Sequence, residues 1–310
     1  DHVAFRPIDV KLGPDGAIYI ADWYNPIIQH GEVDFRDPRR DHTHGRIWRV
    51  TWKGAPKRRL ADPTKASNAE LLEQLRSDDN FHRQAAKQIL RRRGDAVLAD
   101  LRQWLDTIPK NETTEHLRLE ALWVFQSLRT QNHALLHELL QAQDGRVRAA
   151  AVRVLSHWRL DSPAAGKPLL AAAVNDVHPR VRLEAVRAIS YSPNQDSERQ
   201  LSQTTTGVAD GPNIETAMLA TDHPTDQFLD YAIWLTAREL SADWIPAFEK
   251  GSIDFDNNVQ HLLTAFSAVG RGAPVDFLLT KLHAETTTDV QRDQVVQLIG
   301  STCTAEQLSK

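Results

Sequence analysis

The chain has 310 residues, of which 41% are hydrophobic and 25% are charged, as in ordinary globular proteins. This length allows two domains, or one short domain followed by an array of repeats. A formal net charge of −4 gives no electrostatic reason to expect nucleic acid as a partner. No apolar run approaches the roughly 20 residues needed to cross a bilayer. The single cysteine, Cys303, excludes an internal disulfide framework and a cysteine-rich zinc site.

The N-terminal part alternates apolar and polar side chains with the period of two that is typical of β-strands. This pattern predicts strands over residues 5–12, 17–23 and 46–52, and residues 57–60 allow a short fourth strand. The turn at 13–16, Gly-Pro-Asp-Gly, makes the first two strands an antiparallel hairpin. One such sheet is marginal alone because both faces and both edges are open. We therefore expect one blade of a β-propeller, with the neighbouring blades encoded before Asp1.

From residue 67 the apolar residues recur with a helical period, and we expect Asn68 to cap the first helix. One nine-residue motif recurs at 82–90, 117–125, 147–155 and 181–189. It begins with an apolar residue or histidine, continues as Arg-x-x-Ala-x-x-x and ends with a large apolar residue. Its alanines lie 35, 30 and 34 residues apart and should let neighbouring helices approach closely. We expect the arginine to bridge to an aspartate of the neighbouring repeat, worth ~0.2–1 kcal/mol if exposed.

A period of this length with two helices per unit resembles HEAT repeats, which form an α-α superhelix. The predicted fold class is therefore mainly α, a HEAT-like superhelix preceded by a small antiparallel sheet. We expect an incomplete propeller at 1–62, a linker at 63–66 and the helical array at 67–310. The array should be regular to residue 191 and degenerate after a loop near 204–213. Weaker patterns predict helices at 197–203, 214–219, 228–235, 243–250, 259–269, 274–283 and 290–299.

The densest cluster of charge lies between the second and third predicted strands, at 36–46, Arg-Asp-Pro-Arg-Arg-Asp-His-Thr-His-Gly-Arg. A long connection inside a compact sheet is uncommon unless it is functional. Asp41, His42 and His44 are weak candidates for metal ligands, because histidine and aspartate suit zinc, iron or copper. The alternative is that Asp41 and the arginines form an ion-pair network that fixes the loop.

Residues 5–10, 13–26 and 41–49 resemble the last propeller blade of the planctomycete- and verrucomicrobia-type membrane-bound dehydrogenases. In that family a sorbosone/glucose-dehydrogenase-like β-propeller is followed by HEAT repeats and a C-terminal cytochrome c domain. The resemblance implies oxidation of sugars or other alcohols, a PQQ-like quinone or a metal in the propeller, and a periplasmic or cell-envelope location. Haem c would belong to a domain beyond this chain, because no Cys-x-x-Cys-His motif occurs here.

The same resemblance assigns roles within the loop. His42 would be the catalytic base that takes the hydroxyl proton as hydride leaves. Cofactor or substrate binding would fall to neighbouring residues, and arginines would pair with carboxylates in bidentate fashion. These residues are Arg39, Arg40, Asp41, His44 and Arg46. One blade does not contain a complete active site, so they would form only part of it.

Three classes of function are open at this point. The first is a redox enzyme that passes electrons to a haem domain. The second is a scaffold whose helical face holds a protein partner, or docks the chain's own propeller and cytochrome domains. The third is a propeller that binds carbohydrate or metal without turnover.

Overall fold

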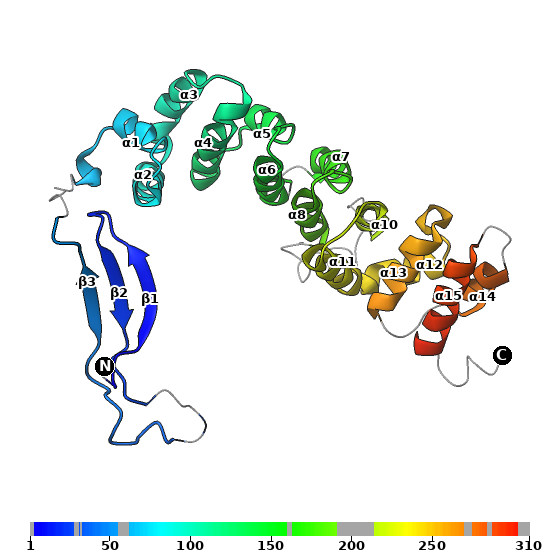
Figure 1. The fold of residues 1–310 in the computed structure, drawn as a ribbon. Coiled ribbons are helices and arrows are strands. Elements are labelled where there is room, and N and C mark those ends of the chain that lie inside the picture. The colour runs from blue at the N-terminus through cyan, green and yellow to red at the C-terminus, as the bar shows by residue number, and fades with distance from the viewer. Residues whose placement is uncertain are drawn as a thin grey trace, which may run out of the picture. The chain divides into compact units, whose positions relative to one another are not determined.

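The computed structural model describes residues 3–27, 31, 33–54, 62–159, 163–190, 214–269, 275–283 and 287–302. The chain forms two compact units, Asp1–Thr107 and Ile108–Lys310. Strands β1–β3 and helices α1–α3 belong to the first unit, and α4 onward to the second (Figure 1). The expected fourth strand at 57–60 and helix at 197–203 lie outside the described residues. The predicted domain boundaries stay a prediction.

The first unit contains the predicted three-stranded antiparallel sheet, in the order β1 (Pro7–Leu12), β2 (Ile18–Asp22) and β3 (Arg46–Val50). Two rows of cross-strand partners, Val10–Ile20–Trp48 and Leu12–Ile18–Val50, share one face because strand side chains alternate. The rows between them place Lys11, Tyr19 and Arg49 on the opposite face. One face of the sheet is therefore apolar, and the other mixes polar residues with Ala21 and Ile47. The described residues leave the apolar face largely exposed.

Helices α1 (Asn68–Gln74), α2 (Asn80–Arg93) and α3 (Leu98–Asp106) complete the described part of this unit. The prediction that Asn68 caps α1 is wrong. Ser67 is the cap, because its extended backbone lets its hydroxyl accept from the Glu70 N–H while Glu70 accepts from the Ser67 N–H. The Asn68 amide instead joins two helices, donating to Asp100 at 2.7 Å and accepting from Arg93 at 2.7 Å.

The second unit is a stack of helices that confirms the predicted α-helical array. Along the stack, α4 contacts α6, α6 contacts α8, α8 contacts α11, α11 contacts α13 and α13 contacts α15. These helices, together with α2, are the second helices of the repeats, and α5 and α7 lie on the other side of the stack (Figure 1). The alanines that define the repeat, Ala121, Ala151 and Ala185, are fully buried, as predicted. The helices are α4 (Glu115–Ser127), α5 (His133–Leu139), α6 (Gly145–Trp158), α7 (Pro163–Ala173), α8 (Pro179–Ser190), α10 (Ile214–Met218), α11 (Gln227–Glu239), α12 (Ser241–Glu249), α13 (Val259–Val269), α14 (Val275–His283) and α15 (Asp289–Thr302).

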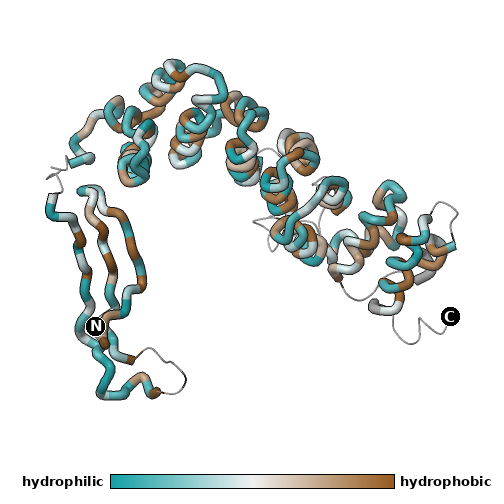
Figure 2. The backbone as a smooth tube through the Cα atoms, viewed as in Figure 1, coloured by the Kyte–Doolittle hydropathy of each residue, from teal (hydrophilic) through white to brown (hydrophobic). Residues whose placement is uncertain are grey.

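Hydropathy follows this layering. In Figure 2 apolar residues alternate with hydrophilic ones along each helix, as expected for helices with one buried face. Among the described residues, no helix is long and apolar enough to cross a membrane.

The recurring arginine behaves as predicted at one repeat and differently at two others. Arg148 pairs with Asp176 of the next repeat at 2.7 and 2.8 Å. Arg118 pairs instead with Glu138 of α5, and Arg182 donates to the backbone oxygens of Asp176 and Pro224. Arg118 and Arg182 are only 4% and 1% exposed, so the energy expected for an exposed ion pair does not apply to them.

A different contact is shared by all four arginines. Each donates to a backbone carbonyl at the turn that leads into its own helix. The acceptor is the oxygen of Ser77 for Arg83, Ile108 for Arg118, Ala142 for Arg148 and Asp176 for Arg182, at 2.5–2.9 Å. The side chain therefore satisfies carbonyls that the end of the preceding helix leaves without a partner.

Replacing Arg182 by alanine should lower the free energy of unfolding by about 2–4 kcal/mol, because buried carbonyls lose a charged donor. The measurement is urea unfolding followed by far-UV circular dichroism. Arg146→Ala is the matched control, because that side chain is 85% exposed and Asp144 is its sole ion-pair partner among the described residues. Its effect should stay within about 0.5 kcal/mol. Equal losses in the two variants would contradict the assigned role of Arg182.

Candidate functional site

The charged loop between β2 and β3 is organised around one buried arginine. Arg40 is 6% exposed and donates to the carbonyl oxygens of Asp34 and Val33 at 2.9 Å and of Ile27 at 3.3 Å. Its guanidinium also lies 5.5 Å from the centre of the Phe35 ring. These contacts use the donors that a substrate carboxylate would need. Arg40 therefore holds the backbone of its own loop.

Asp41 and His44 form a second local cluster. One Asp41 carboxylate oxygen accepts from the backbone N–H groups of Thr43 and His44 at 2.9 and 3.0 Å, and the other lies 2.9 Å from His44 Nδ1. The pKa of Asp41 is lowered to about 2. The hydrogen bond from the Thr43 backbone contributes most to this lowering, whereas burial acts in the opposite direction. The carboxylate stays charged and fixes the turn that leads into β3.

The remaining predicted site residues lie apart from this cluster. His42 is exposed and makes no hydrogen bond or ion pair with the described residues, and Arg39 pairs with Asp37 at the surface. Arg46 lies 3.7 Å above the Tyr24 ring and donates to Asp22 at 3.1 Å. Within the described parts of the chain, no three histidine, cysteine or acidic side chains are placed to hold a metal ion.

Asp22 organises the end of the sheet, and the sequence patterns did not single it out. Its carboxylate accepts from the backbone N–H groups of Arg6 and Tyr24, from the Trp48 indole N–H and from Arg46, at 2.8–3.1 Å. Burial alone would raise its pKa, but these donors outweigh burial and lower the pKa to about 2. The signal in the sequence was an acidic residue at the end of an otherwise apolar strand.

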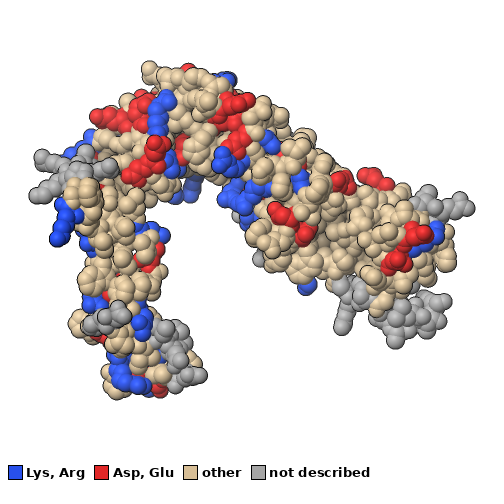
Figure 3. All heavy atoms as spheres, in the orientation of Figure 1, with Lys and Arg blue, Asp and Glu red and all other residues tan. Residues whose placement is uncertain are grey.

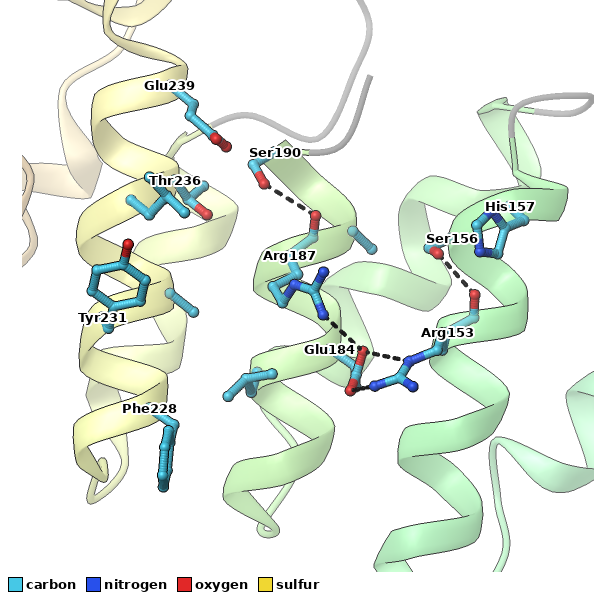
Figure 4. A pocket seen from close by; sticks show the side chains of 14 residues that line it. Arg153, Ser156, His157, Glu184, Arg187, Ser190, Phe228, Tyr231, Thr236 and Glu239 are labelled. Carbon is cyan, nitrogen blue, oxygen red and sulfur yellow. Dashed lines mark hydrogen bonds and ion pairs between the residues drawn. The ribbon is translucent and has the colours of Figure 1, made fainter. Parts of the chain in front are cut away.

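Two adjoining cavities lie in the second unit, along the second helices α4, α6, α8 and α11. A cavity of about 860 Å³ between α6, α8 and α11 adjoins one of about 520 Å³ between α4, α6 and α8. Arg153, His157 and Glu184 line both cavities, so the two form one groove, which we call the α8 groove (Figure 4). The cavity next to α11 also contains Arg187, Phe228, Tyr231, Leu235 and Glu239.

The groove residues occupy equivalent positions in successive repeats. Relative to the buried alanine, the lining positions are five before, one before and two after it, a spacing that forms one stripe on a helix. On α6 these positions hold Arg146, Ala150 and Arg153, and on α8 they hold Arg180, Glu184 and Arg187. The pattern of buried residues in the repeat did not predict this set. The same alignment, read for its exposed positions, contains the signal.

One buried carboxylate gathers the arginines of the groove. Glu184 has a side chain only 4% exposed, and Arg153 of the neighbouring helix pairs with both of its oxygens (Figure 4). Arg180 lies 3.1 Å and Arg187 4.0 Å from the same carboxylate. The hydrogen bond to Glu184 raises the pKa of Arg153, so its charge is secure. Figure 3 shows basic side chains gathered near α6.

The opposite wall of the groove is aromatic. Phe228 and Tyr231 on α11 are 65% and 61% exposed, although both are large side chains. The Tyr231 ring stacks on Trp234 with centroids 5.7 Å apart, and Arg238 lies 4.7 Å from the centre of the Trp234 ring. The helix beneath is firmly held, because Leu229 and Ile233 point into the core. The groove therefore combines fixed cations with exposed, well-supported aromatic rings.

Two parts of the chain match known protein families. Residues 1–54 match a family described as a domain of unknown function (DUF7133), and residues 110–190 match HEAT repeats. The second match confirms the HEAT interpretation over α4–α8, which includes most of the α8 groove. No curated protein and no solved structure matches the chain.

Replacing Arg40 by alanine should expose the loop at 34–46 to proteases, because the carbonyls of Ile27, Val33 and Asp34 lose the donor that ties them to this loop. Limited digestion with chymotrypsin, which cuts after aromatic residues such as Phe35, followed by mass spectrometry, measures this as faster cleavage within the loop. Arg39→Ala is the matched control, because the Arg39 side chain bonds to Asp37 at the surface and to no other described residue. Similar cleavage of the two variants would contradict the organising role of Arg40.

Proposed function

We propose that the helical part of this protein is a scaffold that binds another protein in the α8 groove. The observation that carries this proposal is the pairing of exposed aromatic rings with an arginine cluster across a cavity of about 860 Å³. The match to HEAT repeats supports it, since stacked helical repeats present extended binding surfaces.

The residue types in the groove are those that protein interfaces favour. Tyrosine, tryptophan and arginine are enriched among the residues that dominate binding energy. Exposed rings such as Phe228 and Tyr231 are costly to keep in water, so a contiguous pair on one helix indicates a surface that a partner covers. A partner that docked here would bury both rings without rearranging the core beneath α11.

Placing a photo-crosslinking benzoylphenylalanine at Tyr231 of the full-length protein in its own cells should give a discrete adduct with one other protein. His137 on α5 is the control position, because it is exposed and lies on the opposite layer of the stack. Adducts are compared by gel mobility and identified by mass spectrometry. The absence of any adduct at Tyr231, or the same adducts from both positions, would remove the groove as the binding site.

A second function is favoured by the exposed apolar face of the sheet. We propose that β1–β3 form one blade of a β-propeller in a dehydrogenase of sugars or other alcohols. Propeller blades cover such faces with neighbouring blades, which supports this proposal. Electrons would pass to a haem c in a further domain, and the protein would lie in the periplasm or cell envelope.

The loop residues do not by themselves fit a quinone or a metal. The donors of Arg40 are engaged by carbonyls, and Asp41 is engaged by its own turn. A PQQ-like quinone or metal would therefore need other residues to hold it. His42 is an exposed loop histidine that makes no hydrogen bond with the described residues, so its ring nitrogens stay available to a substrate.

For this second function, His42→Ala should abolish dye-linked sugar or alcohol dehydrogenase activity in the full-length protein while leaving its circular dichroism unchanged. His137→Ala serves as the control, because it removes an exposed histidine from α5. Full activity in the His42 variant would exclude that residue from the reaction. Substoichiometric metal in the purified protein would also exclude binding of a resident ion.

A further inference from the structure

We infer that the partner of the α8 groove is an acidic protein segment that also carries a large apolar side chain. This inference rests on the proposed scaffold function and specifies the chemistry of its partner. Acidic residues of the segment would lie against α6 and α8, and its apolar residue would lie against α11.

The α8 groove holds more positive than negative side chains. Among the described residues that line the groove, Arg146, Arg153, Arg180 and Arg187 face only two glutamates, Glu184 and Glu239. Arg146 is matched by its own helix cap, Asp144, at 2.6 Å. The other three arginines share Glu184, so the cluster keeps an excess of positive charge. A carboxylate from outside would complete it.

Arg180 and Arg187 keep N–H donors available to a partner. The side chains of Arg180 and Arg187 are 54% and 64% exposed, and Arg187 approaches Glu184 no closer than 4.0 Å. A guanidinium has five N–H donors in a planar fork that matches a carboxylate in bidentate fashion. The outward donors of these two arginines can therefore bind a carboxylate while Glu184 keeps its contacts.

Glu184 makes the cluster a prepared site. It is buried and holds cations from two helices in place before any partner arrives. Side chains that are already ordered lose less conformational entropy on binding. The three arginines that share Glu184 exceed Glu184 and Glu239 by one charge, so a single carboxylate would neutralise the cluster, whereas a phosphate dianion would leave it negative.

Apolar side chains of α11 lie beside the arginine cluster. Phe228, Tyr231 and Leu235 line the same cavity as Arg153 and Arg187. A segment that offered only carboxylates would leave these rings in water. A partner that places an aromatic or large aliphatic residue beside its acidic residues uses both walls of the groove.

Fluorescence anisotropy with the full chain tests this inference. The probe is a short fluorescein-labelled peptide of alternating glutamate and phenylalanine, compared with versions carrying glutamine for glutamate, serine for phenylalanine, or phosphoserine for glutamate. The glutamate–phenylalanine probe should bind at least about tenfold more tightly than each comparison peptide, and added salt should weaken its binding.

Variants locate the binding. Arg187→Glu should weaken the glutamate–phenylalanine probe by about tenfold or more, and Arg187→Gln by less, because reversal adds repulsion to the lost attraction. Arg92→Glu on α2 is the matched control, since that exposed arginine lies outside the groove, and it should leave binding unchanged. Circular dichroism checks that each variant is folded. The Arg187 side chain is exposed, so we expect its replacement to leave the fold intact.

The outcomes separate the inference from the scaffold proposal. If the glutamine peptide binds as tightly as the glutamate peptide, and Tyr231→Ser abolishes both, the acidic preference is overturned while the groove remains a binding site. Tighter binding of the phosphoserine peptide would overturn it in favour of a phosphorylated partner. If no peptide responds to Arg187→Glu or Tyr231→Ser, both proposals fail.

Discussion

The helical stack depends on an arginine that donates to the turn before its own helix. The end of a helix leaves carbonyls without partners, and burying them in a repeat array is costly. Arg83, Arg118, Arg148 and Arg182 each place a guanidinium N–H on such a carbonyl. Because the donor is charged and mostly buried, the contact is strong and directional. It fixes where each second helix begins relative to the helix before it.

The α8 groove follows from that constraint. When successive second helices start at equivalent places, equivalent residues lie side by side, and Glu184 of α8 therefore meets Arg153 of α6. The stack continues where the sequence phrase ends, because Arg182 also donates to the carbonyl of Pro224 just before α11. Farther along, a buried histidine, His261 of α13, contacts Asp222 at 2.7 Å. This contact links α13 to the segment before α11 through two side chains and does not involve the turn before α13.

The sequence was sufficient for what depends on local pattern. Strand alternation, helical period and the buried alanines predicted the sheet, the array and its core, because each is set by residues close in sequence. Hydrogen-bond partners were harder to predict, since the choice between Asp176, Glu138 and a backbone oxygen depends on geometry between helices. The charged loop is a related case. Its density suggested a ligand, but Arg40 and Asp41 use their hydrogen bonds on the loop's own backbone.

Two classes of arginine emerge from the repeat, and their positions distinguish them. The structural arginine lies three residues before the buried alanine, and the groove arginines Arg153 and Arg187 lie two residues after it. Five residues along an α-helix correspond to a rotation of about 140° beyond a full turn, so the two positions face different surroundings. One meets the turn of its own repeat, and the other meets the neighbouring helix and solvent. Position relative to the alanine therefore separates arginines that hold this fold from those available to a partner.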